Sequence, residues 1–330
     1  MGVLSRAKSY LRSSNLALAV WLHGYDFMRT LKYMDWRRQP ADIYWQKSSE
    51  LLFQYHKLEK GMCIGGKPRF FGIDALRATC VLMREWQALG LSMDDPIYVG
   101  AVETLRGYKA RLAVTPAPDN LKAEVDALLE ERLAQTQPVP SLSTPIPFDP
   151  VSEATAEALS SLLLHRRSVR DFADRLVERE RVERAFQMAQ LSPSACNRQP
   201  WRVHLYSDRA KIAELLRLQN GNGGFGHTVP LLAVISTDSR SFFNATERAQ
   251  GNLDAGLFLM SFLLALQAQS IASCCLNWCV TPTMDRRAHA AGNIPDHESI
   301  VTYLAIGYAK DDIYVPRSPR RAALSALVYH

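Results

Sequence analysis

The chain has 330 residues, of which 47% are hydrophobic and 22% are charged. This composition excludes an intrinsically disordered protein and is sufficient for a large core. The formal net charge is +6, but Lys and Arg are interspersed with acidic residues, and no signature of a DNA-binding or RNA-binding module occurs. We therefore expect a globular protein that does not bind nucleic acid.

The six cysteines show neither a paired C-x-x-C spacing nor the even framework of a small secreted domain. Three of them, Cys274, Cys275 and Cys279, lie in an apolar stretch where cysteine commonly serves as a small buried hydrophobe. The cysteine usage indicates a reducing cytoplasm and predicts no metal site.

The N-terminal segment has cations at Arg6, Lys8 and Arg12, followed by the apolar run 16–22. The run lacks a small-residue cleavage site and is shorter than the roughly 20 residues of a membrane span. We expect an amphipathic helix that packs on the body of the protein or lies at a membrane surface. Secretion is the remaining alternative.

Residues 1–134 are predicted to form a helical N-terminal region, because apolar residues recur at spacings of three and four. The expected helices are 49–58, 74–88, 96–112 and 120–134. Residues 135–150 are rich in Pro, Ser and Thr, which favours an extended linker. The second domain is expected at 151–330.

One segment of the N-terminal region differs from the helices around it. Charged residues in 56–62 precede the Gly-rich and aromatic stretch 65–72. It is interpreted either as a helix end with a surface turn or as a lid over a ligand, with His56 or Lys60 near the pocket.

The second domain alternates helices and strands, which predicts a sheet covered by helices. The expected helices are 152–165, 178–190, 208–218, 246–269 and 283–291, and the expected strands are 203–206, 231–237, 272–276 and 299–307. Helix 246–269 is apolar on nearly every side, so we expect it to be buried all round.

Two motifs carry chemistry. The first, in 165–172, has three guanidinium groups and a hydroxyl within five residues, and planar Arg side chains suit phosphate oxygens. The second, Ser-Pro-Ser-Ala-Cys-Asn-Arg-Gln-Pro-Trp at 192–201, places hydroxyl and amide groups between prolines that stiffen the loop. Together they offer cations for a phosphate and amides for a polar ring.

In this order and at this spacing, the two motifs resemble the fingerprint of the FMN-dependent nitroreductase family. The resemblance covers roughly residues 152–321 and continues through Asn222, the helix 252–269, the turn 272–278 and the segment 305–308. It implies an α+β FMN-binding fold, a central sheet flanked by helices. It also implies an intertwined homodimer, with the long helix at its centre and two FMN sites at the subunit interface.

The resemblance assigns the FMN phosphate and ribityl chain to Arg166, Arg167, Ser168 and Arg170. The family varies between His and Arg at the position of Arg167. The alternative is a set of cations that follow a helix and only complement its dipole.

The resemblance assigns flavin contacts to the loop of the second motif, partly from the opposite subunit. The assigned residues are Pro193, Ser194, Ala195, Asn197 and Gln199. Without the resemblance these would be ordinary polar groups that satisfy a turn.

Two further positions concern the flavin ring. The family places an Asn where Asn222 stands, with Asn220 as the fallback, and its side chain addresses the polar edge of the isoalloxazine. The turn Leu276, Asn277 and Trp278 corresponds to the one whose backbone N–H faces flavin N5. Many relatives have Gly in this turn.

Arg317 and Arg320 follow the last strand, where relatives place a second basic contact for the phosphate. A solvated tail is the alternative interpretation.

The function implied is that of an FMN-dependent oxidoreductase, in which the cofactor carries the chemistry and the protein orients it. NAD(P)H delivers hydride to flavin N5, and a small organic acceptor then takes it from the same face in a ping-pong cycle. The alternatives are other flavin chemistry on the same fold, namely azoline oxidation, dehalogenation or flavin fragmentation, and a non-catalytic FMN-binding or scaffold protein.

Overall fold

The computed structural model describes residues 15–36, 43–66, 69–134, 136–323 and 326–330. The chain divides into two compact units. One unit contains the residues up to Val151 together with Pro193–Trp201 and Thr237–Leu257, and the other contains Ser152–Ser192, Arg202–Ser236 and Phe258–His330. The first unit thus includes two segments from the second domain predicted on sequence. The domain limits expected from sequence stay a prediction: a helical region to residue 134, a linker at 135–150 and a second domain from residue 151.

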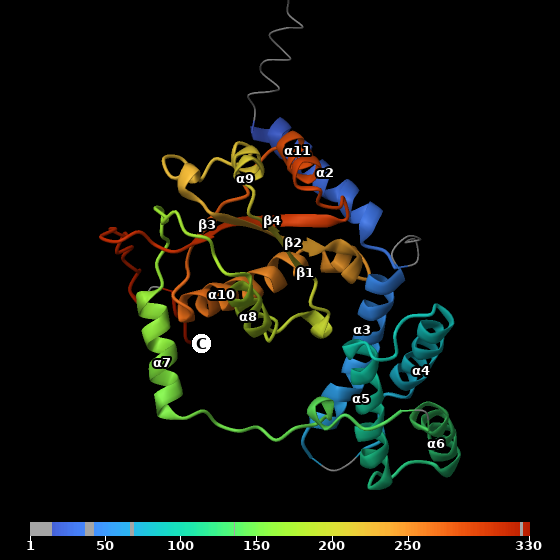
Figure 1. Cartoon of the computed structure of the whole chain (residues 1–330). Helices are drawn as coiled ribbons and strands as arrows, with labels where there is room; N and C mark the ends of the chain where they lie inside the picture. The colour runs from blue at the N-terminus through green and yellow to red at the C-terminus, as the bar shows by residue number, and fades with distance from the viewer. Residues whose placement is uncertain (1–14, 37–42, 67–68, 135, 324–325) are drawn as a thin grey trace, which may run out of the picture. The chain divides into compact units, whose positions relative to one another are not determined.

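The first unit is helical (Figure 1). Its α-helices are α2 (Asn15–Tyr33), α3 (Ile43–Cys63), α4 (Ile73–Ala88), α5 (Pro96–Ala113) and α6 (Asp119–Leu133), and its short 3-10 turns are η1 (Pro140–Leu142), η2 (Ala195–Asn197), η4 (Ser239–Ser241) and η5 (Ala245–Glu247). These helices agree with the predicted ones, except that α3 begins earlier and ends later. The cations Arg6, Lys8 and Arg12 lie outside the described residues.

The core of the first unit lies between α3, α4, α5 and α6. Leu51, Leu76, Trp86 and Leu105 are fully buried there, because apolar residues at helical spacing place one stripe of each helix inward. The start of α5 is set by Asp95, whose carboxylate accepts the N–H of Ile97 at 2.8 Å. Such a cap contributes about 1 kcal/mol.

Residues 56–62 belong to α3, which continues to Cys63. Gly61 permits this end of the helix to pack, because a Cβ there would lie 2.0 Å from the ring of Phe71. The residue before α4, Gly72, has φ +75, a conformation that favours glycine. A role as a lid stays a prediction.

The second unit contains most of a four-stranded sheet in the order β1-β2-β4-β3. The strands are β1 (Trp201–Tyr206), β2 (Leu231–Asp238), β3 (Ala272–Leu276) and β4 (Glu298–Gly307). The helices are α7 (Glu153–His165), α8 (Arg179–Ala189), α9 (Arg209–Leu216), the turn η3 (Gly226–Thr228), α11 (Pro282–Gly292) and, from Phe258 on, α10 (Gln250–Ala268). Strands β3 and β4 are antiparallel, with Ala272 opposite Gly307. The predicted α+β class is confirmed.

Helices cover both faces of this sheet. Figure 1 shows α9 and α11 over one face and α8 with the second half of α10 over the other. On the first face Leu215 and Ala288 pack against strand residues such as Val234. On the second face the ring of Phe186 meets that of Phe258 at 5.5 Å. The predicted layering of helices on a sheet is therefore present.

A buried polar cluster joins three neighbouring strands. Glu298 on β4 accepts hydrogen bonds from Ser236 on β2 and from His204 on β1, the latter at 2.6 Å. Burial would raise the pKa of Glu298, but these hydrogen bonds outweigh it and lower the pKa. The carboxylate is therefore stabilised in its charged form.

Helix α10 corrects one expectation. It was expected to be buried all round, but Leu253, Leu257 and Met260 are 57%, 40% and 38% exposed. These residues repeat at spacings of four and three, so they form one open apolar face. In length and composition α10 would suit a membrane span, but a core helix of a soluble protein has the same properties.

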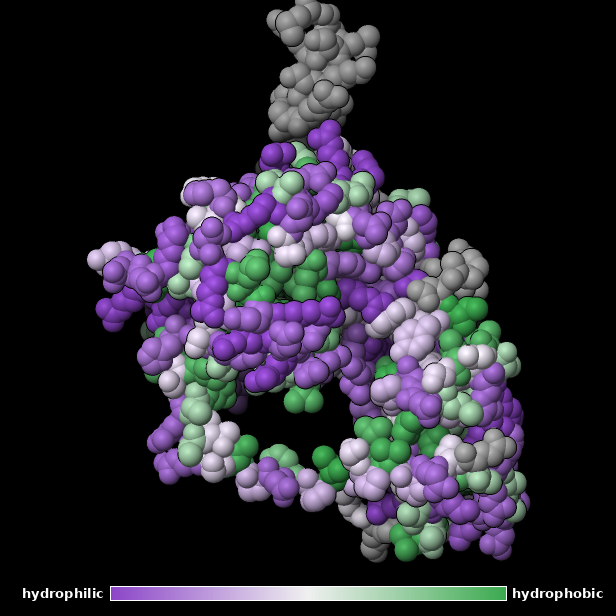
Figure 2. Space-filling view, viewed as in Figure 1, coloured by the Kyte–Doolittle hydropathy of each residue, from purple (hydrophilic) through white to green (hydrophobic). Residues whose placement is uncertain are grey.

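Helix α7 has no buried residue. Its start is capped by Ser152, whose hydroxyl accepts the N–H of Thr155. Leu159, Leu163 and Leu164 are exposed, and Figure 2 shows apolar side chains at the surface of this helix. A helix of this kind needs a further surface to cover it.

Candidate functional site

The arginine cluster follows α7 and runs beside β3 in the second unit. Ser168 pairs with Ser273 of β3, and the N–H of Val169 donates to the carbonyl of Ser273 at 3.1 Å. This pairing fixes the backbone of the cluster against the sheet. The side chain of Ser168 bonds to the Cys274 thiol, whose pKa burial raises despite the opposing effect of Arg170.

The three guanidinium groups of the cluster have no carboxylate partner among the residues that the structure describes. Arg167 donates to the carbonyl of Arg166 at 2.8 Å, and Arg170 to the carbonyl of Ser168 at 3.5 Å. Arg166 and Arg167 are half-buried, whereas Arg170 is exposed. Three cations held together without a counter-charge form a site suited to an anion with several oxygens.

Asn222 and Asn277 are connected through Gln219, which is 6% exposed. The amide nitrogen of Asn222 donates to the Gln219 side-chain oxygen at 2.9 Å and to the carbonyl of Leu216 at 2.7 Å. The amide nitrogen of Gln219 donates in turn to the carbonyl of Asn277 at 3.0 Å. The structure thus brings two predicted residues together, with the amide nitrogen of Asn222 engaged in this network.

The turn after β3 is held by its side chains. The ring of Trp278 stacks on Tyr303 at 4.5 Å, and its indole N–H donates to Asp285 at 2.9 Å. The carboxamide oxygen of Asn277 accepts the N–H of Cys279. Within the described ranges, the backbone N–H groups of Asn277 and Trp278 have no acceptor. A bound ligand could therefore accept a hydrogen bond from each of these two N–H groups.

Three other predicted residues of the second unit are exposed. Asn220 is exposed, and so are Arg317 and Arg320 on the segment after β4, which has no regular structure. Over the part of the chain that is described, no three His, Cys, Asp or Glu side chains are grouped as a metal would require.

Residues 193–201 of the second motif lie in the first unit and form a tight loop. The hydroxyl of Ser194 accepts the N–H of Gln199 at 3.0 Å, and the Gln199 amide donates to the carbonyl of Asn197 at 3.0 Å. Cys196, Asn197 and Gln199 have φ of 52, 54 and 49. Positive φ is costly for residues other than glycine and is often found at functional sites.

The loop is also held from outside. The N–H of Ala195 donates to the carboxylate of Asp254 on α10, at 3.2 Å to one oxygen. Burial raises the pKa of Asp254, although hydrogen bonds from Gln250 and Ala195 oppose this. Lys57 of α3 lies near Cys196, and burial lowers the pKa of this lysine. Ala195 is thus held by a neighbour, Asp254, that the sequence pattern did not indicate.

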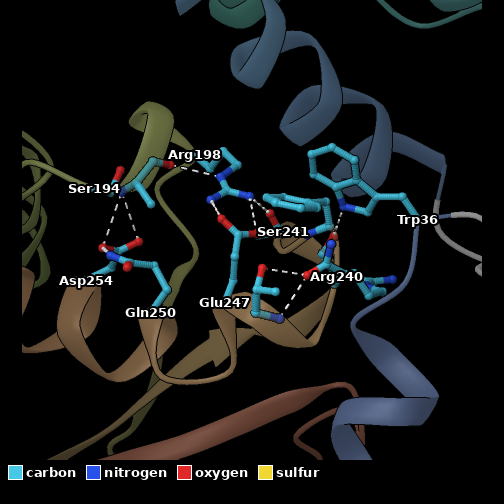
Figure 3. A network of polar contacts seen from close by, with 12 residues as sticks. Trp36, Ser194, Arg198, Arg240, Ser241, Glu247, Gln250 and Asp254 are labelled. Atoms are coloured by element: carbon cyan, nitrogen blue, oxygen red, sulfur yellow. Dashed lines mark hydrogen bonds and ion pairs between the residues drawn. The ribbon is translucent and has the colours of Figure 1, made fainter.

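Arg198 connects the loop to two other segments of the first unit (Figure 3). Its guanidinium is fully buried and pairs with Glu247 through both terminal nitrogens. It also donates to the carbonyls of Ala195 and Ser241, each at 2.9 Å. Beside it, the indole N–H of Trp36 donates to the carbonyl of Arg240 at 2.8 Å.

Four residues of these networks were not predicted from sequence, namely Arg198, Gln219, Glu247 and Asp254. Their hydrogen-bond partners lie between 43 and 59 residues away in the sequence, or come into reach only through the conformation of a loop. The only available signal was the position of Arg198 inside the second motif.

Comparison with known proteins gives matches to one family. Residues 163–222 match the sequence model of the Nitroreductase family. A protein of Archaeoglobus fulgidus with the provisional name NADH dehydrogenase/NAD(P)H nitroreductase is 27% identical over 162 residues, 47% of this chain and 88% of that protein. The 4-nitrobenzoate reductase of a Nocardioides species is 23% identical over 202 residues, 46% of this chain and 81% of the relative.

Among solved structures, an FMN-dependent nitroreductase from Clostridium difficile is 21% identical, with a TM-score of 0.44, and the match covers 51% of this chain and 96% of that one.

The resemblance to the nitroreductase family is thereby confirmed, and the segment that matches contains the whole arginine cluster together with Asn222. The protein is an enzyme of the oxidoreductase class.

Proposed function

We propose that this oxidoreductase uses FMN, takes hydride from NAD(P)H and passes it to a small organic acceptor. The observation that carries the proposal is the arginine cluster, which has no carboxylate partner among the described residues and lies within the segment matched by the family. The names of the similar proteins support the reaction: one contains NAD(P)H and another is a nitrobenzoate reductase.

The donor set of the second unit fits a flavin mononucleotide. Arg166, Arg167 and Arg170 with the Ser168 hydroxyl would bind the phosphate, because Arg forms charge-assisted hydrogen bonds with phosphate oxygens. Ser168 lies beside Ser273 near the start of β3, and Asn277 follows its end. About 13 Å of extended strand separates these two levels, which suits a cofactor with a phosphate at one end and a ring at the other.

When bound, FMN supplies a ring atom, N5, that accepts and returns hydride. The backbone N–H groups of Asn277 and Trp278 would donate to the ring edge and stabilise charge there. Gln219 would hold this turn in place through the carbonyl of Asn277. Other cofactor contacts stay predictions. One is the contact of Asn222 with the flavin ring, and the others are those of Pro193, Ser194, Ala195, Asn197, Gln199, Arg317 and Arg320.

We also propose that the protein is a homodimer. The open apolar faces of α10 and α7 support this, because exposed Leu and Met side chains in rows are typical of surfaces covered by a partner. All six cysteines are without disulfides, which supports a reducing compartment such as the cytoplasm.

The phosphate assignment is tested by FMN affinity. The Arg166→Ala/Arg170→Ala variant loses two charge-assisted contacts of about 1.5–3 kcal/mol each, so FMN should bind at least about 100-fold more weakly. The Arg217→Ala/Arg287→Ala variant removes the same charge at exposed positions and should bind FMN like the wild type. Unchanged affinity in the first variant, measured by flavin fluorescence, would refute the assignment.

A further inference from the structure

Helix α2 presents an apolar face to solvent along its whole length. With 3.6 residues per turn, Leu16, Val20, Phe27 and Leu31 form one row on the helix. The adjacent row is Ala17, Trp21, Gly24 and Met28. The large side chains of both rows are between 46% and 74% exposed. They form a continuous surface about 22 Å long that the described chain leaves open.

Asp26, Arg29 and Thr30 lie on the side of α2 away from these two rows. The Thr30 hydroxyl donates to the carbonyl of Asp26 at 2.9 Å, and the Lys32 ammonium lies 4.8 Å from the centre of the Tyr33 ring. The Arg29 guanidinium lies 5.6 Å from the Tyr25 ring. These contacts lie within the helix and do not involve the exposed Leu, Val, Trp, Phe and Met side chains of the two rows.

The charge of this segment indicates what covers the face. Residues 1–33 contain five Lys or Arg residues and one acidic residue, Asp26, a net charge of 5 − 1 = +4 out of +6 for the whole chain. A tenth of the chain therefore carries most of the positive excess. An apolar face in a segment of net positive charge complements a surface that is apolar inside and anionic outside.

We propose that α2 lies in the plane of an anionic lipid bilayer, with its apolar face below the headgroups and its cations beside them. Trp21 suits this boundary, since its ring is apolar and its N–H is polar. The charged residues Asp26, Arg29 and Lys32 fit a helix on the surface rather than one that spans the bilayer. A second copy is a poorer partner, because two segments of charge +4 repel each other. This surface is independent of the flavin site.

The test is the binding of the full-length protein to lipid vesicles, measured by co-sedimentation. One preparation is phosphatidylcholine alone, and the other has about one third phosphatidylglycerol. The wild type should bind the anionic vesicles at least roughly tenfold more tightly, since each cation adds roughly fivefold. Raising the salt to about 0.5 M should weaken this preference.

Two variants separate the apolar face from charge alone. Val20→Glu/Met28→Glu places two carboxylates in the face and should reduce binding by roughly tenfold or more. Met93→Glu/Val114→Glu adds the same number of carboxylates at exposed Met and Val positions outside α2. Both variants lose a similar electrostatic attraction, so the first should bind at least roughly tenfold more weakly than this control. If the first variant does not fold, Val20→Ser/Met28→Ser gives the same comparison.

Three results would overturn the proposal. One is a wild type that binds neither vesicle preparation. Another is equal loss of binding in the two glutamate variants, which would leave only a nonspecific effect of charge. The third is a wild-type dimer that ignores vesicles and dissociates when residues 20 and 28 are changed, which would assign the face to a second copy of the chain.

Discussion

Replacement of Arg198 tests how the loop of the second motif is held. Arg198→Met keeps much of the apolar stem but removes the donors to Glu247 and to the carbonyls of Ala195 and Ser241. The Glu247 side chain is 15% exposed, so its carboxylate would be left largely buried without its cation. Removing one partner of a buried ion pair costs about 3–5 kcal/mol. We therefore expect the variant to lose about this much stability.

A double-mutant cycle identifies the cause. Glu247→Gln removes the negative charge but keeps an oxygen that can accept the N–H of Phe243, now bonded at 2.9 Å. In the Arg198→Met/Glu247→Gln variant no unpaired charge remains. Its loss should be smaller than the sum of the two single losses by about 2 kcal/mol.

The assay is urea unfolding followed by tryptophan fluorescence, because Trp36 lies beside the Arg198 guanidinium, 6.0 Å from ring centre to carbon. Additive losses, or a loss below about 1 kcal/mol for Arg198→Met, would refute the reasoning that this pair anchors the loop.

Three further predictions follow from other parts of the structure. The folded-state pKa of Glu298 is lowered, so its stabilising contribution is present above the unfolded value of about 4.3 and is lost as the pH falls through the folded value. The free energy of unfolding should therefore fall less steeply with decreasing pH in Glu298→Gln than in the wild type. The same pH dependence in both proteins would contradict this. Gln219→Leu should cost about 1–3 kcal/mol and weaken FMN binding, because Asn222 and the turn at Asn277 lose their bridge; unchanged affinity would show that the turn is not part of the site. Met260→Glu should convert the proposed dimer to monomers in sedimentation velocity, whereas a dimer that persists would exclude the open face of α10 as its interface.

Helices and strands were predictable from sequence because their signals are local. The pattern for α4 and α5 places their ends within two residues of the structure, and the strand at 272–276 is the same in both. Apolar spacing and capping residues suffice for such elements. The type and order of the elements therefore followed directly from the chain.

The surroundings of the candidate site were less predictable because they depend on distant residues. The motif residues Ser194 and Ala195 were recognised, but the hydrogen bond from Ala195 to Asp254 spans 59 positions. Gln219 carried no signal because a glutamine near a helix end is usually exposed. Burial of α10 was overestimated, since periodicity shows which faces are apolar but not what covers them.

The central claim is that the protein is a flavin-dependent oxidoreductase, and the visible absorption spectrum tests it most directly. Purified protein, incubated with FMN and separated from excess, is measured before and after anaerobic addition of NADH and of NADPH. We expect bound flavin whose absorption bands bleach with one of these donors. Flavin bands that persist with both donors would contradict the nicotinamide-driven reaction, and a protein that retains no flavin would contradict the proposed cofactor itself.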